Sequence, residues 1–363
     1  MEFALTHDQI QMQESLDRTL ERVAPLDRIR AVADQPTPLA PDIAAAVAEL
    51  GAPAVLVPEA YGGLGLGVLD AALLAEVLGR HAAPVPYIGP VLAGLALSLS
   101  GSETQKLAWL PGIASGKTVL GLALSEFASG ARMDAGVSAS QGMLNGKALF
   151  ALDAATADAF IVADRAGGLH LVTANATGLT QTALTSIDRT RSIAELTFKD
   201  TPSEPVDQGD VANTLIRMRD AGRVLLAADT LGAAQRMIDR AVAYAKERQQ
   251  FGRVIGSYQA VKHMCAEMAA ELEPCRALIW YAGYAQDALP DEASLTAAHA
   301  KAHLSEIGRF VARTSTEVFG GIGITDLLGL HYLFKRIGLN RQLLGAPERL
   351  RREAAVMQGF IDA

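Results

Sequence analysis

The stretch YAKERQQFGRVIGSYQ, residues 244–259, lies between two long runs of sequence with helical periodicity. In it, Arg248 is followed by Phe251-Gly252 and, eleven residues after the arginine, by Gln259. Apolar side chains on either side, in residues 215–231, 258–272 and 304–318, recur at spacings of three or four. Such stripes are typical of long helices that pack face to face, so the sequence predicts a four-helix bundle in the C-terminal part of the chain.

The rest of the chain divides into two further zones. Residues 5–117 are rich in the strong helix formers Ala, Leu and Glu and are interrupted by prolines and glycines, which predicts several short helices. Residues 119–198 hold short apolar runs separated by Gly, Asn, Asp and Ser, which predicts a small β domain. The polar segment TPSEPVDQG, residues 201–209, is expected to be a linker between this domain and the bundle.

Composition excludes several classes of protein. Half of the 363 residues are apolar and the net charge is −8, which excludes disorder as the main state and argues against a dedicated nucleic-acid binder. Two cysteines, Cys265 and Cys275, make no disulfide framework and favour a reducing, cytoplasmic location. Residues 1–10 are too polar for a signal peptide, and the most apolar stretch, residues 87–100, is shorter than the roughly 20 residues of a spanning helix, so no membrane partner is expected.

Two features suggest binding sites that the sequence does not complete. The glycine-rich run GGLGLG, residues 62–67, lacks the third glycine of a dinucleotide-binding loop and is interpreted as a turn between helices. His299 and His303 are four residues apart on an expected helix, but Ala300 stands where a metalloprotease would have its glutamate. With no third ligand evident, no metal site is predicted.

The segment 244–259 resembles the bundle motif of the acyl-CoA dehydrogenase flavoprotein family, which carries Arg-x-x-Phe-Gly and a Gln eleven residues after the Arg. Further segments resemble the family in the same order along the chain, so the resemblance covers nearly all of it. They are PEAYGG (58–63), LALSEFASG (122–130), the segment 145–164 and FGGIG (319–323).

The resemblance implies a mainly α fold with a central β domain. The expected parts are an N-terminal helical domain, a small β-barrel or sandwich, and a C-terminal four-helix bundle, at residues 1–117, 118–208 and 209–363.

Family chemistry is the α,β-dehydrogenation of an acyl-CoA thioester with FAD, in which a carboxylate removes the α-proton while a hydride leaves for the flavin. A guanidinium fork suits a pyrophosphate and an aromatic ring covers an adenine, while a glycine turn lets the backbone approach a cofactor closely. By resemblance, FAD contacts are expected from Ser125, Phe150, Arg248, Phe251, Gln259, Glu317, Gly320 and Gly321.

Both positions that hold the catalytic base in this family lack a carboxylate here. The usual position, 24 residues after the first glycine of FGGIG, holds Leu344, and the turn glycine of that segment survives as Gly345. The alternative position, on the first bundle helix, holds Gly222. Neither side chain takes a proton, so no catalytic residue is predicted. The family's Trp-x-Thr near the flavin also reads Phe150-Ala151-Leu152, without the hydroxyl.

A chain that keeps the bundle motif and lacks the base resembles one subunit of the two-gene acyl-CoA dehydrogenases, which are heterotetramers that act on bulky substrates such as steroid side-chain thioesters, and on dicarboxylic acyl groups. The resemblance therefore implies a subunit that completes the FAD site of a homologous partner. Its other expected partners are the acyl-CoA substrate and an electron-transfer-flavoprotein-like acceptor.

Two alternatives stay open from the sequence. In the first, the chain is a self-sufficient homotetramer, either with an unusual base such as Asp220 or Glu348 or with a base-free reaction such as desulfination of an acyl-CoA. In the second, the chain is a non-enzymatic scaffold.

Overall fold

The computed structural model of the protein describes residues 4–129 and 135–362. Its N-terminal part is helical, and capping boxes at Thr6–Gln9 and Ser102–Gln105 begin the first and last of its helices. Proline stands in the first turn of the third helix, where its missing N–H has no partner to lose. The helices are α1 (His7–Val23), α2 (Leu26–Ala33), α3 (Pro41–Glu49), α4 (Val68–Arg80), α5 (Ile88–Ser100) and α6 (Glu103–Ala114), with single turns η1 (Ala52–Ala54) and η2 (Glu59–Tyr61).

The central part is one curled sheet in the order β6-β7-β3-β1-β4-β5-β8, with β2 paired to β3. Only the β1–β4 pair among these described strands is parallel. The sheet has a small hydrophobic core of its own, in which Phe160 and Phe198 are the largest side chains. The elements are β1 (Leu120–Ala123), α7 (Ser125–Ser129), β2 (Gly136–Ser140), β3 (Met143–Leu152), η3 (Ala154–Thr156), β4 (Ala159–Ala163), β5 (Leu169–Thr173), β6 (Leu179–Ala183), β7 (Ile193–Pro202) and β8 (Glu204–Pro205).

Four of the nine residues of the predicted linker 201–209 belong to strands, so the linker is shorter than predicted. β7 extends to Pro202, and β8 pairs with β5 through Pro205 and His170. Proline is tolerated in both places because one ends a strand and the other lies on an edge, where its missing N–H removes no inner ladder bond. Only the four residues 206–209 separate the last strand from the residue that caps α8.

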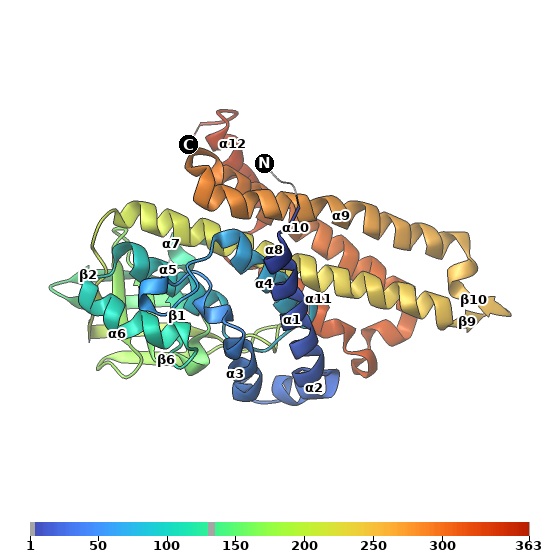
Figure 1. Ribbon diagram of the computed structural model, residues 1–363, viewed down its shortest axis with the longest axis horizontal. Coiled ribbons are helices and arrows are strands. Elements are labelled where there is room, and N and C mark those ends of the chain that lie inside the picture. The colour runs from blue at the N-terminus through green and yellow to red at the C-terminus, as the bar shows by residue number, and fades with distance from the viewer. Residues whose placement is uncertain (1–3, 130–134, 363) are drawn as a thin grey trace.

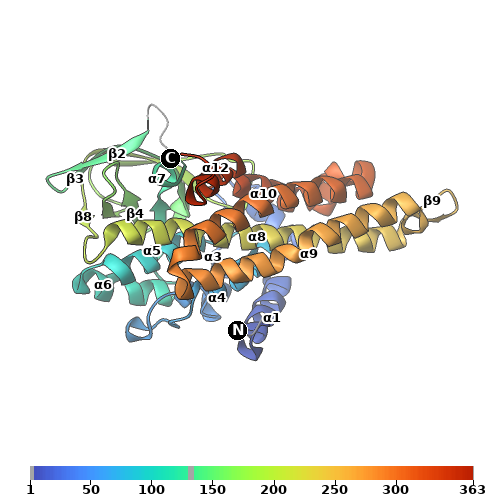
Figure 2. The same cartoon turned by 90° about the horizontal axis from the view of Figure 1, so that it is seen from above.

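The C-terminal part is built on three helices of thirty residues or more, which run side by side in Figures 1 and 2. A small hairpin, β9–β10, lies at the end of the bundle farthest from the sheet (Figure 1). The elements are α8 (Val211–Glu247), β9 (Gln249–Gln250), β10 (Arg253–Val254), η4 (Ile255–Ser257), α9 (Gln259–Ala288), α10 (Pro290–Phe319), η5 (Gly320–Ile324), η6 (Asp326–Leu328), α11 (Leu330–Gln342) and α12 (Pro347–Met357). This order is the fold that the sequence predicts, whereas the domain boundaries at 117/118 and 208/209 stay predictions.

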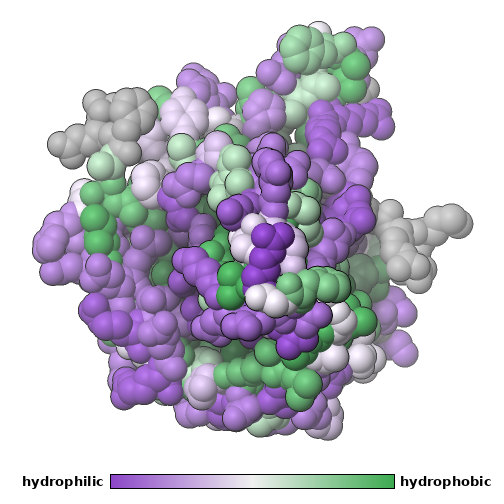
Figure 3. All heavy atoms as spheres, turned by 90° about the vertical axis from the view of Figure 1, so that its right-hand side faces the viewer, coloured by the Kyte–Doolittle hydropathy of each residue, from purple (hydrophilic) through white to green (hydrophobic). Residues whose placement is uncertain are grey.

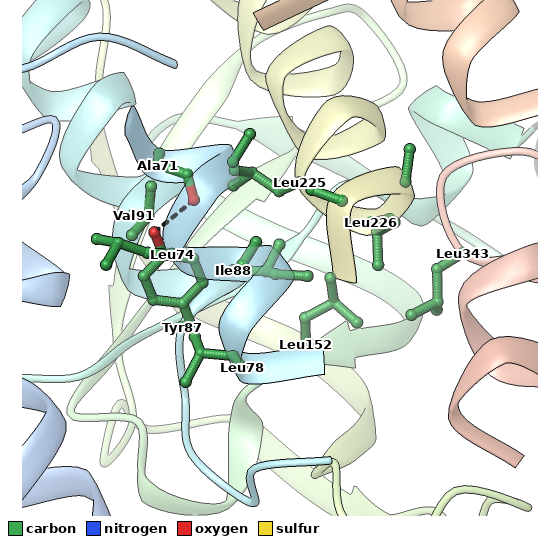
Figure 4. Packing of buried hydrophobic residues seen from close by; sticks show 14 of the residues in the cluster. Ala71, Leu74, Leu78, Tyr87, Ile88, Val91, Leu152, Leu225, Leu226 and Leu343 are labelled. Atoms are coloured by element: carbon green, nitrogen blue, oxygen red, sulfur yellow. Dashed lines mark hydrogen bonds between the residues drawn. The ribbon is translucent and has the colours of Figure 1, made fainter. Parts of the chain in front are cut away.

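Two glycines let α4 lie directly against α8. A Cβ on Gly79 would be 2.0 Å from the carbonyl oxygen of Asp229, and a Cβ on Gly232 would be 1.8 Å from that of Glu76. Any side chain at either position would force the two helices apart. The core continues from this contact to the sheet, and Figure 4 shows Ile88 of α5, Leu152 of β3 and Leu226 of α8 in one cluster. The Tyr87 hydroxyl beside them donates to the carbonyl oxygen of Ala71 at 2.8 Å.

A buried ion pair joins the three parts of the chain. Arg336 of α11 donates from Nη2 to Oδ2 of Asp229 on α8 at 2.7 Å. Its Nη1 donates to Oγ1 of Thr190, between β6 and β7, at 3.0 Å and to the carbonyl oxygen of Ala83, after α4, at 3.1 Å. Arg191 lies 2.8 Å from the same carboxylate. Burial alone would raise the pKa of Asp229, but the two guanidinium groups lower it to about 2.

No helix in residues 4–129 or 135–362 is long and apolar enough to cross a membrane.

Replacement of Asp229 by Asn should destabilise the fold by about 3–5 kcal/mol, because two buried guanidinium groups lose their counter-charge. Since the pKa of Asp229 is lowered on folding, the wild-type carboxylate stabilises the fold above its unfolded pKa of 3.8, and this contribution is lost as the pH falls toward about 2. Urea unfolding at pH 7 and pH 3 measures both effects. A variant as stable as wild type at pH 7, or a difference that does not shrink at pH 3, would contradict the role of this pair.

Candidate functional site

The predicted FAD-contact residues of the bundle gather at its far end. Arg248 is the C-cap of α8, and Gln259 is the first residue of α9. Between them, Phe251 and Gly252 form the hairpin turn with φ of +52° and +79°. Arg253 lies 3.9 Å above the ring of Tyr258, whose hydroxyl donates to the carbonyl oxygen of Gln250, so the hairpin is braced from both sides.

The glycine turn lies at the same end. The rings of Tyr244 and Phe319 are 4.5 Å apart between centroids and join the last turn of α8 to the end of α10. Gly320 and Gly321 follow, and a Cβ on either would meet no atom within 4 Å, so the turn is open on its outer side. Glu317, one turn before, is exposed.

Several apolar side chains and the guanidinium group of Arg248 are exposed to solvent at this end of the bundle. Phe251 is 92% exposed. Ile324 and Leu327, a few residues after the glycine turn, are 77% and 73% exposed, respectively. Arg248 is exposed and pairs with no carboxylate of the residues that the structure describes. Figure 3 looks onto this end and shows apolar residues in patches among hydrophilic ones. A guanidinium, a bare ring and an open glycine turn together suit a ligand or chain bound from outside.

A second candidate site lies where the sheet meets the bundle. A cavity of about 650 Å³ is lined by Phe150 of β3 and by Leu343 and Leu344, which follow α11. Phe150 has a φ of +55° and its ring is partly exposed to the cavity. The structure therefore brings Phe150 together with Leu344, the usual base position, in one cavity that Arg248 does not line.

The two positions where the family resemblance leads us to expect the base, Leu344 and Gly222, lie in contact, and the Leu344 side chain fills the space between them. A Cβ on Gly222 would be 2.5 Å from Cδ1 of Leu344 and 2.9 Å from Cδ1 of Leu92. Leu344 has a φ of +54°, an unfavourable conformation for leucine, and Gly345 follows at +114°. The buried Arg223 holds this turn through Nε, which donates to the carbonyl oxygen of Leu344 at 3.0 Å.

Neither alternative base lies in this cavity. Both oxygens of Asp220 are engaged, because Arg219 donates to Oδ1 at 2.8 Å and Ser294 donates to Oδ2 at 2.5 Å. Glu348 is exposed and paired with Arg341, and backbone hydrogen bonding, together with this guanidinium, lowers the pKa of the Glu348 carboxyl.

Leu152, which stands in the hydroxyl position of the family's Trp-x-Thr, does not line the cavity. It is buried in the core beside Leu226 and Leu343 (Figure 4). The side chain of Ser125, the other expected hydroxyl, lies outside the described part of the structure; its backbone begins α7.

Sequence reasoning missed Glu126, the residue after Ser125. It lines the cavity, and its Oε1 accepts a hydrogen bond from the backbone N–H of Leu149 at 2.6 Å. Burial raises the pKa of the Glu126 carboxyl. The signal was its place in the flavin-type segment 122–130, but nothing in the sequence says that this glutamate faces a cavity. In the described ranges, no three His, Cys, Asp or Glu side chains are placed to hold a metal ion.

Comparison with known proteins identifies the family to which the sequence is similar. Residues 6–117 match the model of the acyl-CoA dehydrogenase N-terminal domain, and residues 213–356 match that of the C-terminal domain. The chain is 32% identical over 343 residues to acyl-CoA dehydrogenase IpdE2 of Mycolicibacterium smegmatis, covering 94% of this chain and 96% of that one.

Solved structures agree. The Tcur3481–Tcur3483 steroid acyl-CoA dehydrogenase, in its G363A variant, is 28% identical with a TM-score of 0.88, over 97% of this chain and 98% of that one. The ChsE4–ChsE5 complex from Mycobacterium tuberculosis is 25% identical with a TM-score of 0.90, over the whole of both chains. This protein therefore belongs to the acyl-CoA dehydrogenase family, whose enzymes are oxidoreductases that act on CH–CH groups.

Proposed function

We propose that this protein is the subunit of an FAD-dependent acyl-CoA dehydrogenase that lacks the catalytic base and completes the FAD site of a homologous partner. The observation that carries the proposal is the contrast between the two sites. The base positions are filled with packed leucine, whereas the flavin-contact end of the bundle is exposed and unpaired.

The distance between the two sites supports a cofactor shared with another chain. Gly222 and the end of α8 at Glu247 are 25 residues apart on one continuous helix, which is roughly 37 Å at 1.5 Å per residue. This is far longer than the five-carbon chain that links the flavin ring of FAD to its pyrophosphate. Arg248 and the Leu344 cavity of the same chain therefore do not serve the two ends of one FAD.

The exposed residues fit an FAD that a partner presents. Arg248 offers a fork of N–H donors to the pyrophosphate, Phe251 offers a ring face to the adenine, and the open turn at Gly320 lets the cofactor approach the backbone. Gln259, Glu317 and Gly321 lie at the same end. When bound, FAD supplies the hydride acceptor of the family reaction.

The α-proton needs a second group, because a thioester α-carbon is only weakly acidic and a positioned base must take its proton. Leu344 and Gly222 supply none, and Asp220 and Glu348 are held elsewhere by other partners. These contacts weigh against the self-sufficient homotetramer. The exposed Arg248 and Phe251 weigh against the non-enzymatic scaffold, because a scaffold that binds no cofactor does not need groups that suit a pyrophosphate and an adenine.

The named relatives suggest the substrate class and the assembly. One is a steroid acyl-CoA dehydrogenase and another is a complex of two chains. We infer a cytoplasmic α2β2 heterotetramer that acts on a bulky acyl-CoA, of the steroid side-chain or dicarboxylic type, and passes electrons to an electron-transfer-flavoprotein-like acceptor.

Replacement of Arg248 by Ala should weaken FAD retention in the complex by about tenfold or more, because a hydrogen bond to a charged group contributes about 1.5–3 kcal/mol. Flavin fluorescence released during dialysis measures it, and circular dichroism confirms that the bundle stays folded. Arg18→Ala, which removes an exposed guanidinium from α1, is the matched control and should retain flavin like wild type. Equal retention by the two variants would remove Arg248 from the site.

Replacement of Leu344 by Glu should create no dehydrogenase activity in the chain alone. A base has no effect without a hydride acceptor within reach, and this chain presents its flavin contacts to a partner. Turnover with an artificial electron acceptor over a panel of acyl-CoA thioesters measures it. Activity of the variant, or of wild type purified alone, would mean that this chain holds a complete active site.

A further inference from the structure

A separate cavity, of about 370 Å³, lies between the N-terminal helices and the bundle. Its lining comes from the α1–α2 connection, the end of α4, the middle of α8 and the start of α11, and Figure 1 shows α1 and α2 beside the bundle. The volume is within the range of sites that bind small molecules. None of the residues expected to contact FAD lines this cavity, and neither Leu344 nor Gly222 does.

The lining of this cavity is cationic, although the chain has a net charge of −8. Three arginines contribute to it, Arg80 of α4 together with Arg236 and Arg240 of α8. Among the described residues of the lining, the exposed Glu21 is the single carboxylate. The cavity therefore carries an excess of positive charge.

Arg80 has counter-charges of its own outside the lining. Its Nη1 lies 2.9 Å from Oδ2 of Asp239, and its Nε lies 3.6 Å from Oδ1 of Asp17. The uncompensated charge therefore belongs to the two arginines of α8.

Arg236 and Arg240 are four positions apart and so share one face of α8. Arg236 makes no hydrogen bond or ion pair with any residue in 4–129 or 135–362, and within the same ranges Arg240 donates only to the carbonyl oxygen of Leu328. Burial, together with the neighbouring Arg236 guanidinium, lowers the pKa of Arg240. An anion that bridges the two guanidinium groups would relieve their repulsion and accept their free N–H donors.

Most of the remaining lining is apolar. Leu26 and Ile29 of α2 and Leu333 of α11 contribute to it, and the last two are buried. Ala24 and Pro25 of the α1–α2 connection complete this surface. Such a surface favours a hydrocarbon body over a hydrated inorganic ion.

The charge of the two arginines selects among organic anions. A carboxylate carries a single negative charge and would leave one guanidinium group without a counter-charge. A phosphate monoester carries a charge of about −1.5 to −2 at pH 7 and has three oxygens that accept hydrogen bonds. Two guanidinium forks match that geometry.

We propose that this cavity binds a phosphate monoester on an apolar body, with Arg236 and Arg240 holding the phosphate and the apolar side chains of α2 and α11 contacting the body. The inference goes beyond the proposed function and does not depend on it, because the residues expected to contact FAD lie outside this cavity.

1-Naphthyl phosphate is a suitable probe, because it joins a phosphate monoester to an apolar ring system. Isothermal titration calorimetry with the full chain should give a dissociation constant on the order of 100 micromolar. 1-Naphthoate, which has the same rings and a carboxylate, and inorganic phosphate, which has no rings, should each bind several-fold more weakly.

Arg236→Gln should weaken binding of the probe about tenfold or more, because a charge-assisted hydrogen bond is lost. Arg236→Lys keeps the charge without the fork and should lie between wild type and Arg236→Gln. Arg309→Gln, which removes an exposed guanidinium from α10, is the matched control and should bind like wild type. Thermal unfolding should show all three variants folded, since Arg236 has no partner in the described part of the chain.

Two further measurements separate this inference from the proposed function. Arg248→Ala should bind 1-naphthyl phosphate like wild type, and Arg236→Gln should retain FAD in the complex. Loss of probe binding in Arg248→Ala, with binding kept in Arg236→Gln, would place the probe at the flavin contacts and overturn the proposal.

The proposal would also be overturned by no binding to wild type at a probe concentration about tenfold above the expected constant. Equal binding by wild type and Arg236→Gln would have the same consequence. Tighter binding of 1-naphthoate than of 1-naphthyl phosphate would contradict the phosphate, and equal binding of inorganic phosphate would contradict the apolar body.

Discussion

The buried pair of Arg336 and Asp229 is the constraint on which the rest of the structure depends. One guanidinium ties α11 to α8, to the sheet through Thr190 and to the N-terminal helices through Ala83. Lys301 of α10 then holds the end of α11, because its Nζ donates to the carbonyl oxygen of Asn340 at 2.6 Å. The Leu343–Gly345 turn follows directly, so the pair also positions the cavity and Leu344, which stands at the expected base position.

The same long helix carries both halves of the functional account. Near its beginning, Gly222 is packed against Leu344, so hydrocarbon occupies the place where the family resemblance leads us to expect a catalytic carboxylate. At its end, Arg248 and the Phe251 turn are exposed, and Arg248 pairs with no carboxylate in residues 4–129 or 135–362. Under the proposed function, this arrangement suits a subunit whose partner holds the flavin and the base.

Local sequence patterns predicted the helices and the turn that depend on residues close together in the chain. Helical stripes located α8, α9 and α10, and the spacing of Arg248 to Gln259 marked the end of the bundle. The linker was predicted too long, at 201–209, because the pairing of β8 with β5 is a tertiary contact that polar, proline-bearing residues do not reveal. The contact of Gly222 with Leu344, the inward turn of Leu152 and the cavity position of Glu126 join residues more than twenty positions apart, and no local pattern encodes them.

The central claim is that one flavin serves two unlike chains. The most direct measurement is the flavin content of the chain purified alone and of its complex with a homologous, glutamate-bearing partner, from the absorbance of flavin and protein together with the native mass. The account predicts almost no flavin in the chain alone and one flavin per pair of chains in the complex. One flavin per chain, in a homotetramer that oxidises acyl-CoA without a partner, would contradict it.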